Sequence, residues 1–171
     1  MVCPSKPALI LSRRMRLLCI GILLLLGSCC RLTQSARPAM QTHALRLRPG
    51  QDLKRSLDEF ARAQGLQAGF VLTCVGSLRK AVLRPANQTQ PWVREQKFEI
   101  VSLVGTLSPD GSHLHVSLSD STGAAFGGHL LEGCEIYTTA EIVLGEATQL
   151  RFRRELDAQT TFKELVVEKK R

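Results

Sequence analysis

Apolar and polar side chains alternate with a two-residue period shortly after residue 40. Over residues 42–48, Leu45 and Leu47 alternate with two arginines. This period predicts a half-buried strand, and Pro49-Gly50 predicts the turn that ends it.

The spacing becomes helical in residues 51–64. Apolar side chains there recur at i, i+4, i+7 and i+8, and they are Leu53, Leu57, Phe60 and Ala61. This spacing gathers them into one stripe, which predicts an amphipathic helix. Asp52 favours the N-terminal end of this helix, and Gly65 is expected to end it.

Almost every later segment has strand character. The apolar and β-branched runs cover residues 68–78, 81–84, 98–107, 113–119, 124–131, 135–144 and 150–156. Short connections rich in turn residues separate them, which predicts hairpins and a mainly antiparallel sheet. Residues 160–171 are expected to form a final strand or a short helix with a charged tail. The expected fold class is α/β of the α+β type, with one principal helix.

Composition divides the chain into a leader at residues 1–36, a domain at 40–158 and a C-terminal tail at 159–171. Residues 1–40 contain six Lys/Arg and no acid, whereas residues 41–171 contain 17 basic and 15 acidic side chains. The net charge of +8 is therefore +6 from the first part and +2 from the second. The high isoelectric point thus describes the leader and does not indicate a nucleic-acid-binding surface.

The leader has the pattern of a signal peptide. An apolar run of 11 residues at 17–27 follows three closely spaced arginines. At about 1.5 Å per residue it is too short for a bilayer core of roughly 30 Å. Leu26-Gly27-Ser28-Cys29 resembles a bacterial lipobox, so export with a lipidated Cys29 is expected, with cleavage after Ala36 as an alternative. Translation from Met40, which would leave the protein cytoplasmic, and an organelle transit peptide are the other interpretations.

Cysteine content does not decide the compartment. Of the six cysteines, only Cys74 and Cys134 lie in the predicted domain. Both lie in apolar strand-like segments, which favours a small buried side chain, and a disulfide between them stays open. The sequence Asn87-Gln88-Thr89 is a glycosylation sequon, relevant only to a secreted eukaryotic protein.

Three of the four histidines, His113, His115 and His129, fall within 17 residues. In a strand, His113 and His115 share one face, while Leu114 and Val116 occupy the other. The next strand delivers His129 through a turn, so the three imidazoles can converge on one cation at about 2.0 to 2.1 Å each. This predicts an open three-histidine site that keeps water, with zinc as the first candidate and nickel, copper and iron as alternatives. A polar histidine cluster without metal is the competing interpretation.

Other residues near this cluster in sequence leave alternatives open. Glu132, Glu135 and Glu141 are acids that could orient a histidine or act as a base, and spacing selects none of them. Gly127 and Gly128 either let backbone approach the site or a neighbouring chain closely or mark a bulge.

Four motifs together resemble the PPC domain of plant and prokaryotic proteins over residues 42–157. In chain order they are LRLRPGQDL, AGFVLTCVGSLRKAVLR, FEIVSLVGTLSPDGSHLHVSLSD and GGHLLEGCEIYTTAEIVL. The resemblance implies an antiparallel sheet beside a helix and assembly as a homotrimer. It also implies that the H-x-H and G-G-H histidines, here His113, His115 and His129, bind a metal.

The same resemblance raises the question of whether this chain binds DNA. Plant members carry an AT-hook with an Arg-Gly-Arg core, and this sequence has no such core. The predicted domain is nearly neutral, and the chain has one Trp and one Tyr, so phosphate contacts and base stacking are poorly supplied. Nucleic-acid binding is therefore not expected from this chain alone.

The leading hypothesis is an exported or lipid-anchored homotrimer that binds a metal and whose activity is unassigned. Its metal site is expected to hold or transform a small anionic ligand, with the metal as a Lewis acid or an activator of water. One alternative is a protein-interaction scaffold. The other is a DNA-associated regulatory protein, which requires translation from Met40 and a basic face created by assembly.

Overall fold

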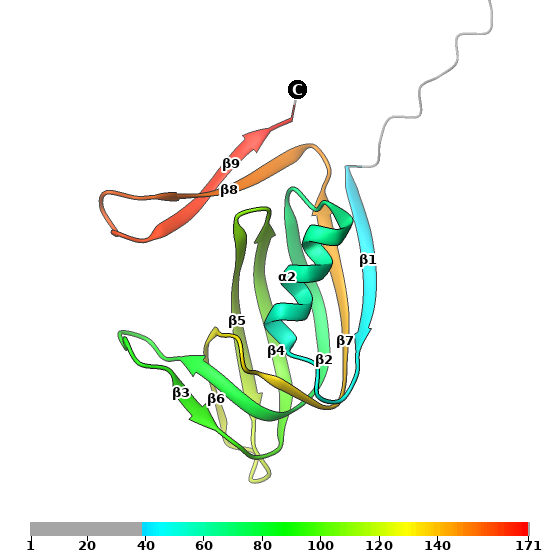
Figure 1. The fold of residues 1–171 in the computed structure, drawn as a ribbon, viewed down its shortest axis with the longest axis vertical. Helices are drawn as coiled ribbons and strands as arrows, with labels where there is room; N and C mark the ends of the chain where they lie inside the picture. Colours follow the sequence, from blue (N-terminus) through cyan, green and yellow to red (C-terminus); the bar gives the residue numbers. More distant parts are fainter. Residues whose placement is uncertain (1–38, 171) are drawn as a thin grey trace, which may run out of the picture. The chain divides into compact units, whose positions relative to one another are not determined.

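The computed structural model describes residues 39–170. The predicted signal peptide, lipobox and cleavage sites lie outside the described residues. The described part is mainly antiparallel β-structure with one α-helix, as predicted (Figure 1). In chain order the elements are β1 (Met40–Leu47), α2 (Leu53–Gln64), β2 (Gly69–Arg84), β3 (Trp92–Arg94), β4 (Phe98–Ser108), β5 (Gly111–Ser119), β6 (Ala125–Leu130), β7 (Glu135–Ala147), β8 (Leu150–Leu156) and β9 (Lys163–Lys169).

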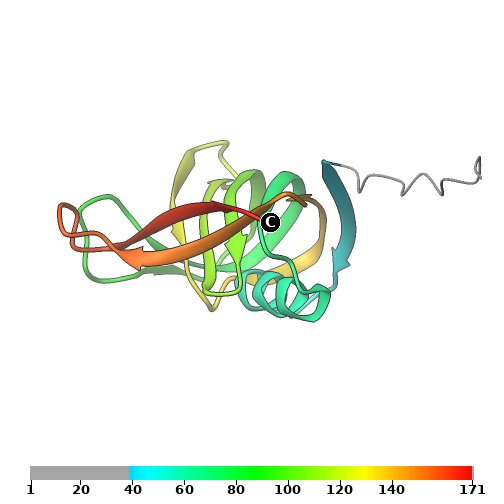
Figure 2. The same ribbon diagram turned by 90° about the horizontal axis from the view of Figure 1, so that it is seen from above.

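Helix α2 begins and ends where the sequence predicts. The Asp52 carboxylate accepts a hydrogen bond from the Arg55 backbone N–H at 2.9 Å, and Gly65 ends the helix in the left-handed conformation at φ 66°. Leu53 and Leu57 are fully buried against the sheet, and such burial stabilises a fold by roughly 1.5 to 3 kcal/mol per side chain. The helix thus covers one face of the sheet (Figure 2). No helix within residues 39–170 is long and apolar enough to cross a membrane.

The main sheet has the strand order β1-β7-β2-β4-β5-β6, and β3 pairs with β2. The first part of β2 pairs with β4, while its end pairs with β6 through Leu83 opposite Leu130 and Arg84 opposite His129. Strands β2, β4, β5 and β6 therefore form a closed circuit of neighbours. This circuit brings the end of β2 beside the histidine-bearing strands.

Two details of the sheet differ from the sequence prediction. Strand β2 is continuous across Arg79 and Lys80, where the pattern predicted a break between two strands. These charges are accommodated at the surface, because Arg79 pairs with Glu135 at 2.6 Å and Lys80 pairs with Glu95 at 3.1 Å. The short strand β3 was not predicted, because three residues are too few to show a period.

The C-terminal residues form a hairpin of their own. Strands β8 and β9 pair over their full lengths and make a separate two-stranded sheet, so a strand and not a helix follows residue 160. The hairpin docks near the β4–β5 turn, where the Asp110 carboxylate accepts a hydrogen bond from the Arg154 backbone N–H at 3.1 Å. Segments far apart in sequence are thereby joined.

Cys74 and Cys134 are buried and free. Burial raises the pKa of the Cys74 thiol to about 12 and that of the Cys134 thiol to about 11. The Cys134 sulfur also donates to the Val82 carbonyl oxygen at 3.3 Å. Both residues are therefore small core side chains, as predicted, and they form no disulfide.

Candidate metal centre

Two neighbouring strands carry the three predicted ligands. His113 and His115 lie on β5, and His129 lies on β6 directly opposite His115. Leu114 and Val116 are buried on the other face of β5, whereas His115 is exposed. The predicted separation of histidines and apolar residues onto two faces is confirmed, and the fold brings the three histidines together.

Each histidine contributes one nitrogen to the cluster. His113 Nε2 lies 3.1 Å from His129 Nδ1 and 3.2 Å from His115 Nε2, and His115 Nε2 lies 3.1 Å from His129 Nδ1. Nitrogens bound at about 2.0 to 2.1 Å around a tetrahedral zinc ion are about 3.4 Å apart, so this donor set fits a divalent metal. Within residues 39–170 no fourth His, Cys, Asp or Glu joins the cluster. The described residues could therefore offer three ligands to a metal ion and would leave its remaining positions open.

Burial and positive neighbours lower the pKa of two of these imidazoles. The pKa of His129 is lowered to about 4, first by desolvation and then by the charge of Arg84. Desolvation also lowers the pKa of His113, followed by the charge of Arg154, while Glu164 acts in the opposite direction. Both rings are therefore neutral near pH 7, which is the state that ligates a metal.

The three acids near the histidines in sequence lie elsewhere in space. Glu132 pairs with Arg55 at 3.1 Å, and Glu135 pairs with Arg79. Glu141 lines a different hollow, formed by β1, β2 and β7. In this arrangement none of them orients a histidine of the cluster.

Gly127 and Gly128 allow close backbone approach on both sides of β6. A Cβ atom at Gly127 would collide with the Val116 carbonyl oxygen of β5, and one at Gly128 would lie 2.7 Å from the Arg84 carbonyl oxygen of β2. The β5–β6 register runs through both glycines without a shift. The structure therefore shows no bulge here, and the close approach that it shows is to the neighbouring strands β5 and β2.

Residues 34–148, well over half of the chain, match the model of the Plants and Prokaryotes Conserved (PCC) domain. The chain belongs to the PCC domain family. This match confirms the resemblance to the PPC domain that the four sequence motifs indicated. The match ends before the β8–β9 hairpin begins.

Relatives of this PCC-domain chain include one longer protein and several solved structures. The bifunctional protein GlmU of Synechococcus sp. (strain JA-3-3Ab) is 52% identical over 131 residues, covering 77% of this chain and 21% of that protein. The chain thus spans about a fifth of the length of the curated relatives it matches. A hypothetical protein from Salmonella enterica has 38% identity and a TM-score of 0.75, covering 76% of this chain and 94% of its own. A metal-containing protein from Archaeoglobus fulgidus has 31% identity and a TM-score of 0.60, covering 74% and 93%.

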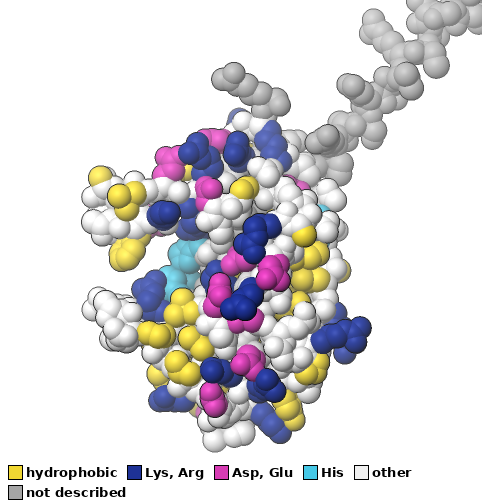
Figure 3. Space-filling model, viewed as in Figure 1, with side chains coloured by type: hydrophobic (Ala, Val, Ile, Leu, Met, Phe, Trp, Pro, Cys, Tyr) yellow, Lys and Arg dark blue, Asp and Glu magenta, His cyan; other side chains and the backbone are white. Residues whose placement is uncertain are grey.

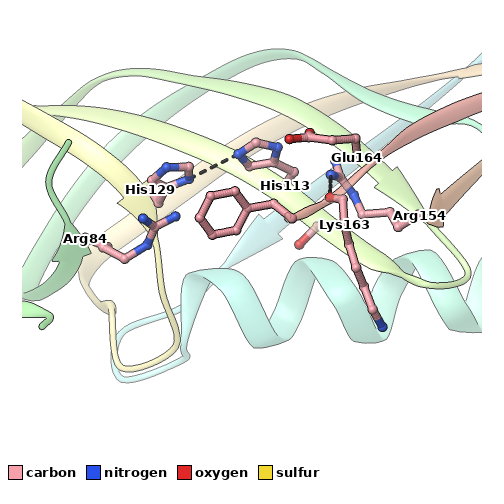
Figure 4. Close-up of a pocket in the computed structure, with 8 residues that line it drawn as sticks. Arg84, His113, His129, Arg154, Lys163 and Glu164 are labelled. Atoms are coloured by element: carbon pink, nitrogen blue, oxygen red, sulfur yellow. Dashed lines mark hydrogen bonds between the residues drawn. The ribbon is translucent and has the colours of Figure 1, made fainter. Parts of the chain in front are cut away.

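A cavity of about 360 Å³ opens beside the histidines of the PCC-domain protein. Figure 3 shows histidine side chains at the base of a hollow with basic side chains at its rim. The walls of the cavity include Arg84, His113, His129, Arg154, Phe162 and Glu164 (Figure 4).

The sequence patterns did not identify the charged residues of these walls as part of the site. Arg84 ends β2, whereas Arg154 and Glu164 belong to the hairpin. No spacing rule relates residues so far apart along the chain. The hairpin brings Arg154 and Glu164 to the histidines because it docks on the sheet. Only the three-dimensional structure shows this docking.

Proposed function

We propose that this PCC-domain protein binds a divalent metal through His113, His115 and His129 and holds a small anionic ligand at the open positions. The observation that carries the proposal is the convergence of three imidazole nitrogens to within 3.2 Å of one another. The metal-containing relative from Archaeoglobus fulgidus supports it. Zinc is the proposed metal, because neutral imidazoles in a three-ligand open site suit it well.

The surrounding residues support the anionic nature of the ligand. A metal bound here supplies a Lewis acid for a ligand oxygen or activates a water molecule. Arg84 and Arg154 line the same cavity and attract negative charge. Glu164 lines it from the hairpin, so a carboxylate that can accept a proton stands in the wall beside His113.

The proposal includes assembly as a homotrimer. The sheet exposes several large apolar side chains outside its core, and they are Leu72, Val75, Val101, Val104 and Tyr137. Exposed apolar side chains of this size favour an interaction surface, and association with further copies would remove them from water. Three copies are proposed from the family resemblance.

The proposal also places the protein outside the cytoplasm, anchored through Cys29 or released by cleavage after Ala36. Its support is the basic, apolar and small-residue order of residues 1–36. The PCC match begins at residue 34, so nearly all of this segment precedes the matched region.

Elemental analysis of protein purified without a histidine tag tests the metal site. Wild-type protein is expected to contain close to one divalent metal ion per chain. His115→Ala should lose most of it, because one of three ligands is removed. His43→Ala is the matched control, because His43 lies on β1 and packs edge-on against Phe60 at 5.9 Å. Equal metal content in wild-type and His115→Ala protein would refute the site.

A further inference from the structure

The β8–β9 hairpin forms one wall of the cavity, although it lies beyond residue 148, where the PCC match ends. Phe152 anchors the hairpin, because its side chain is buried and its backbone N–H donates to the Gln67 carbonyl oxygen at 2.8 Å. Two residues further along β8, the Arg154 backbone N–H donates a hydrogen bond to the Asp110 carboxylate. These contacts fix where the Arg154 side chain leaves the strand.

The guanidinium group of Arg154 is held beside the histidines by uncharged acceptors. Its Nη2 donates to Thr106 Oγ1 at 3.1 Å, and its Nη1 donates to the Lys163 carbonyl oxygen at 3.2 Å. Thr106 is the register partner of His113, so the group lies next to the metal-binding strand. Arg154 makes no ion pair within residues 39–170. A partly buried guanidinium with unused N–H groups is therefore presented to the cavity.

Arg84 supplies a second unpaired guanidinium on the opposite side. The β2–β6 register places it next to His129, and it makes no ion pair with another described residue. Figure 4 shows Arg84 beside His129 and Arg154 beyond His113, while the Lys163 ammonium points away from both histidines. Glu164 is the acid in this wall, so two guanidinium groups face one carboxylate.

We propose that the cavity binds a small molecule with two oxyanion charges, one at the histidine-held metal and one between Arg84 and Arg154. This inference rests on the proposed metal site, which supplies the first anchoring point. Guanidinium groups bind carboxylates and phosphates through paired N–H donors, and Arg154 is preorganised for this by Thr106. A volume of about 360 Å³ is near the lower end of ligand cavities, so the ligand is small. Short dicarboxylates and phosphate share this chemistry.

Calorimetric titration of the metal-loaded protein with malonate, inorganic phosphate and malonamide tests the inference. Malonate or phosphate should bind, and their relative affinities tell which of the two sources supplies the dianion. Malonamide, which has the shape of malonate without its charges, should bind at least about tenfold more weakly than malonate. Equal binding of malonate and malonamide, or no binding of either dianion by the metal-loaded protein, overturns the proposal.

Substitutions locate the second anchoring point. Arg154→Gln and Arg84→Gln should each weaken dianion binding by about tenfold to a hundredfold, because each removes a charge-assisted donor. Arg153→Gln is the matched control with unchanged affinity, because Arg153 pairs with Glu155 and Glu168. If Arg154→Gln fails to fold, Thr106→Val keeps the charge, removes the acceptor that positions it, and should weaken binding several-fold. We call the pair Arg84 and Arg154, with the anion between them, the guanidinium clamp. Folded variants that bind the dianion as tightly as the wild type overturn this clamp.

Metal content measured on the same samples separates this inference from the proposed function. If the protein contains metal but its affinity for the dianion does not depend on Arg154, the clamp is refuted and the metal site stands. If the protein contains no metal but its affinity for the dianion still depends on Arg154, the metal site is refuted and the clamp stands.

Discussion

His115 on β5 and His129 on β6 occupy directly opposed register positions, and His115 Nε2 lies 3.1 Å from His129 Nδ1. Side chains alternate between the two faces of a strand, so a one-residue slip of β6 would turn His129 to the opposite face. The geometry of the candidate site therefore depends on the register of one strand pair. The close packing of Gly127 and Gly128 against the strands on either side helps to fix that register.

Acid should destabilise the metal-free protein below about pH 6.5. The pKa of His129 is about 4 in the folded protein and 6.5 without the fold, and the pKa of His113 is lowered as well. Between these values the unfolded chain binds more protons than the folded chain, so the free energy of unfolding falls as the pH falls. Urea unfolding of metal-free protein at pH 7.5 and pH 5 measures this change.

The comparison variant for the acid effect is His129→Gln. It removes the imidazole whose pKa is lowered to about 4, so its midpoint of unfolding should depend less on pH over the same interval. An identical loss of stability in wild-type and variant protein would show that other groups cause the acid sensitivity.

Gly105→Ala should destabilise the fold and weaken metal binding together. Gly105 has a φ of 140°, and an added Cβ would collide with the His113 carbonyl oxygen. Overpacking and strain of this kind cost about 2 to 4 kcal/mol, and the displaced strand carries two of the three proposed ligands. Thermal or urea unfolding, with metal content on the same samples, checks both effects.

Gly123→Ala controls for backbone strain alone. Its φ is 84°, and an added Cβ meets nothing within 4 Å. A loss of about 1 kcal/mol without loss of metal is expected there. A Gly105→Ala protein as stable as this control would contradict the predicted collision.

A charged side chain on the exposed face of the sheet should dissociate the proposed homotrimer. Val75 and Val101 are 56% and 59% exposed, and an aspartate at either position would have to be desolvated in an interface. Light scattering should report three times the chain mass for wild-type protein and a smaller assembly for Val75→Asp or Val101→Asp. Leu156→Asp, at a position 74% exposed on the hairpin, should keep the wild-type mass. A wild-type monomer across micromolar concentrations would exclude the trimer.

Processing of the leader should be visible at the N-terminus of the native protein. Mass spectrometry of fractionated cells is expected to find an acylated Cys29, or an unmodified start from Cys29 to Arg37. A chain beginning at Met40 in the soluble cytoplasmic fraction would defeat export and favour the DNA-associated alternative.

The parts of the fold set by local chemistry were predictable from sequence. Asp52 and Gly65 mark the ends of α2 because a cap and a left-handed residue act on their own helix. The two-residue period likewise placed His113 and His115 on the polar face of β5. The remaining walls of the cavity were not predictable, because the Asp110–Arg154 contact joins residues 44 positions apart. It depends on where the hairpin docks, and no local pattern encodes that.

The free thiols of Cys74 and Cys134 bear on the redox environments in which this domain keeps its stability. With both thiols buried and their pKa values raised to about 12 and 11, little reactive thiolate forms, and the fold depends on no cross-link. Such a core has the same stability in a reducing and in an oxidising environment. The same interior therefore suits either environment without redesign.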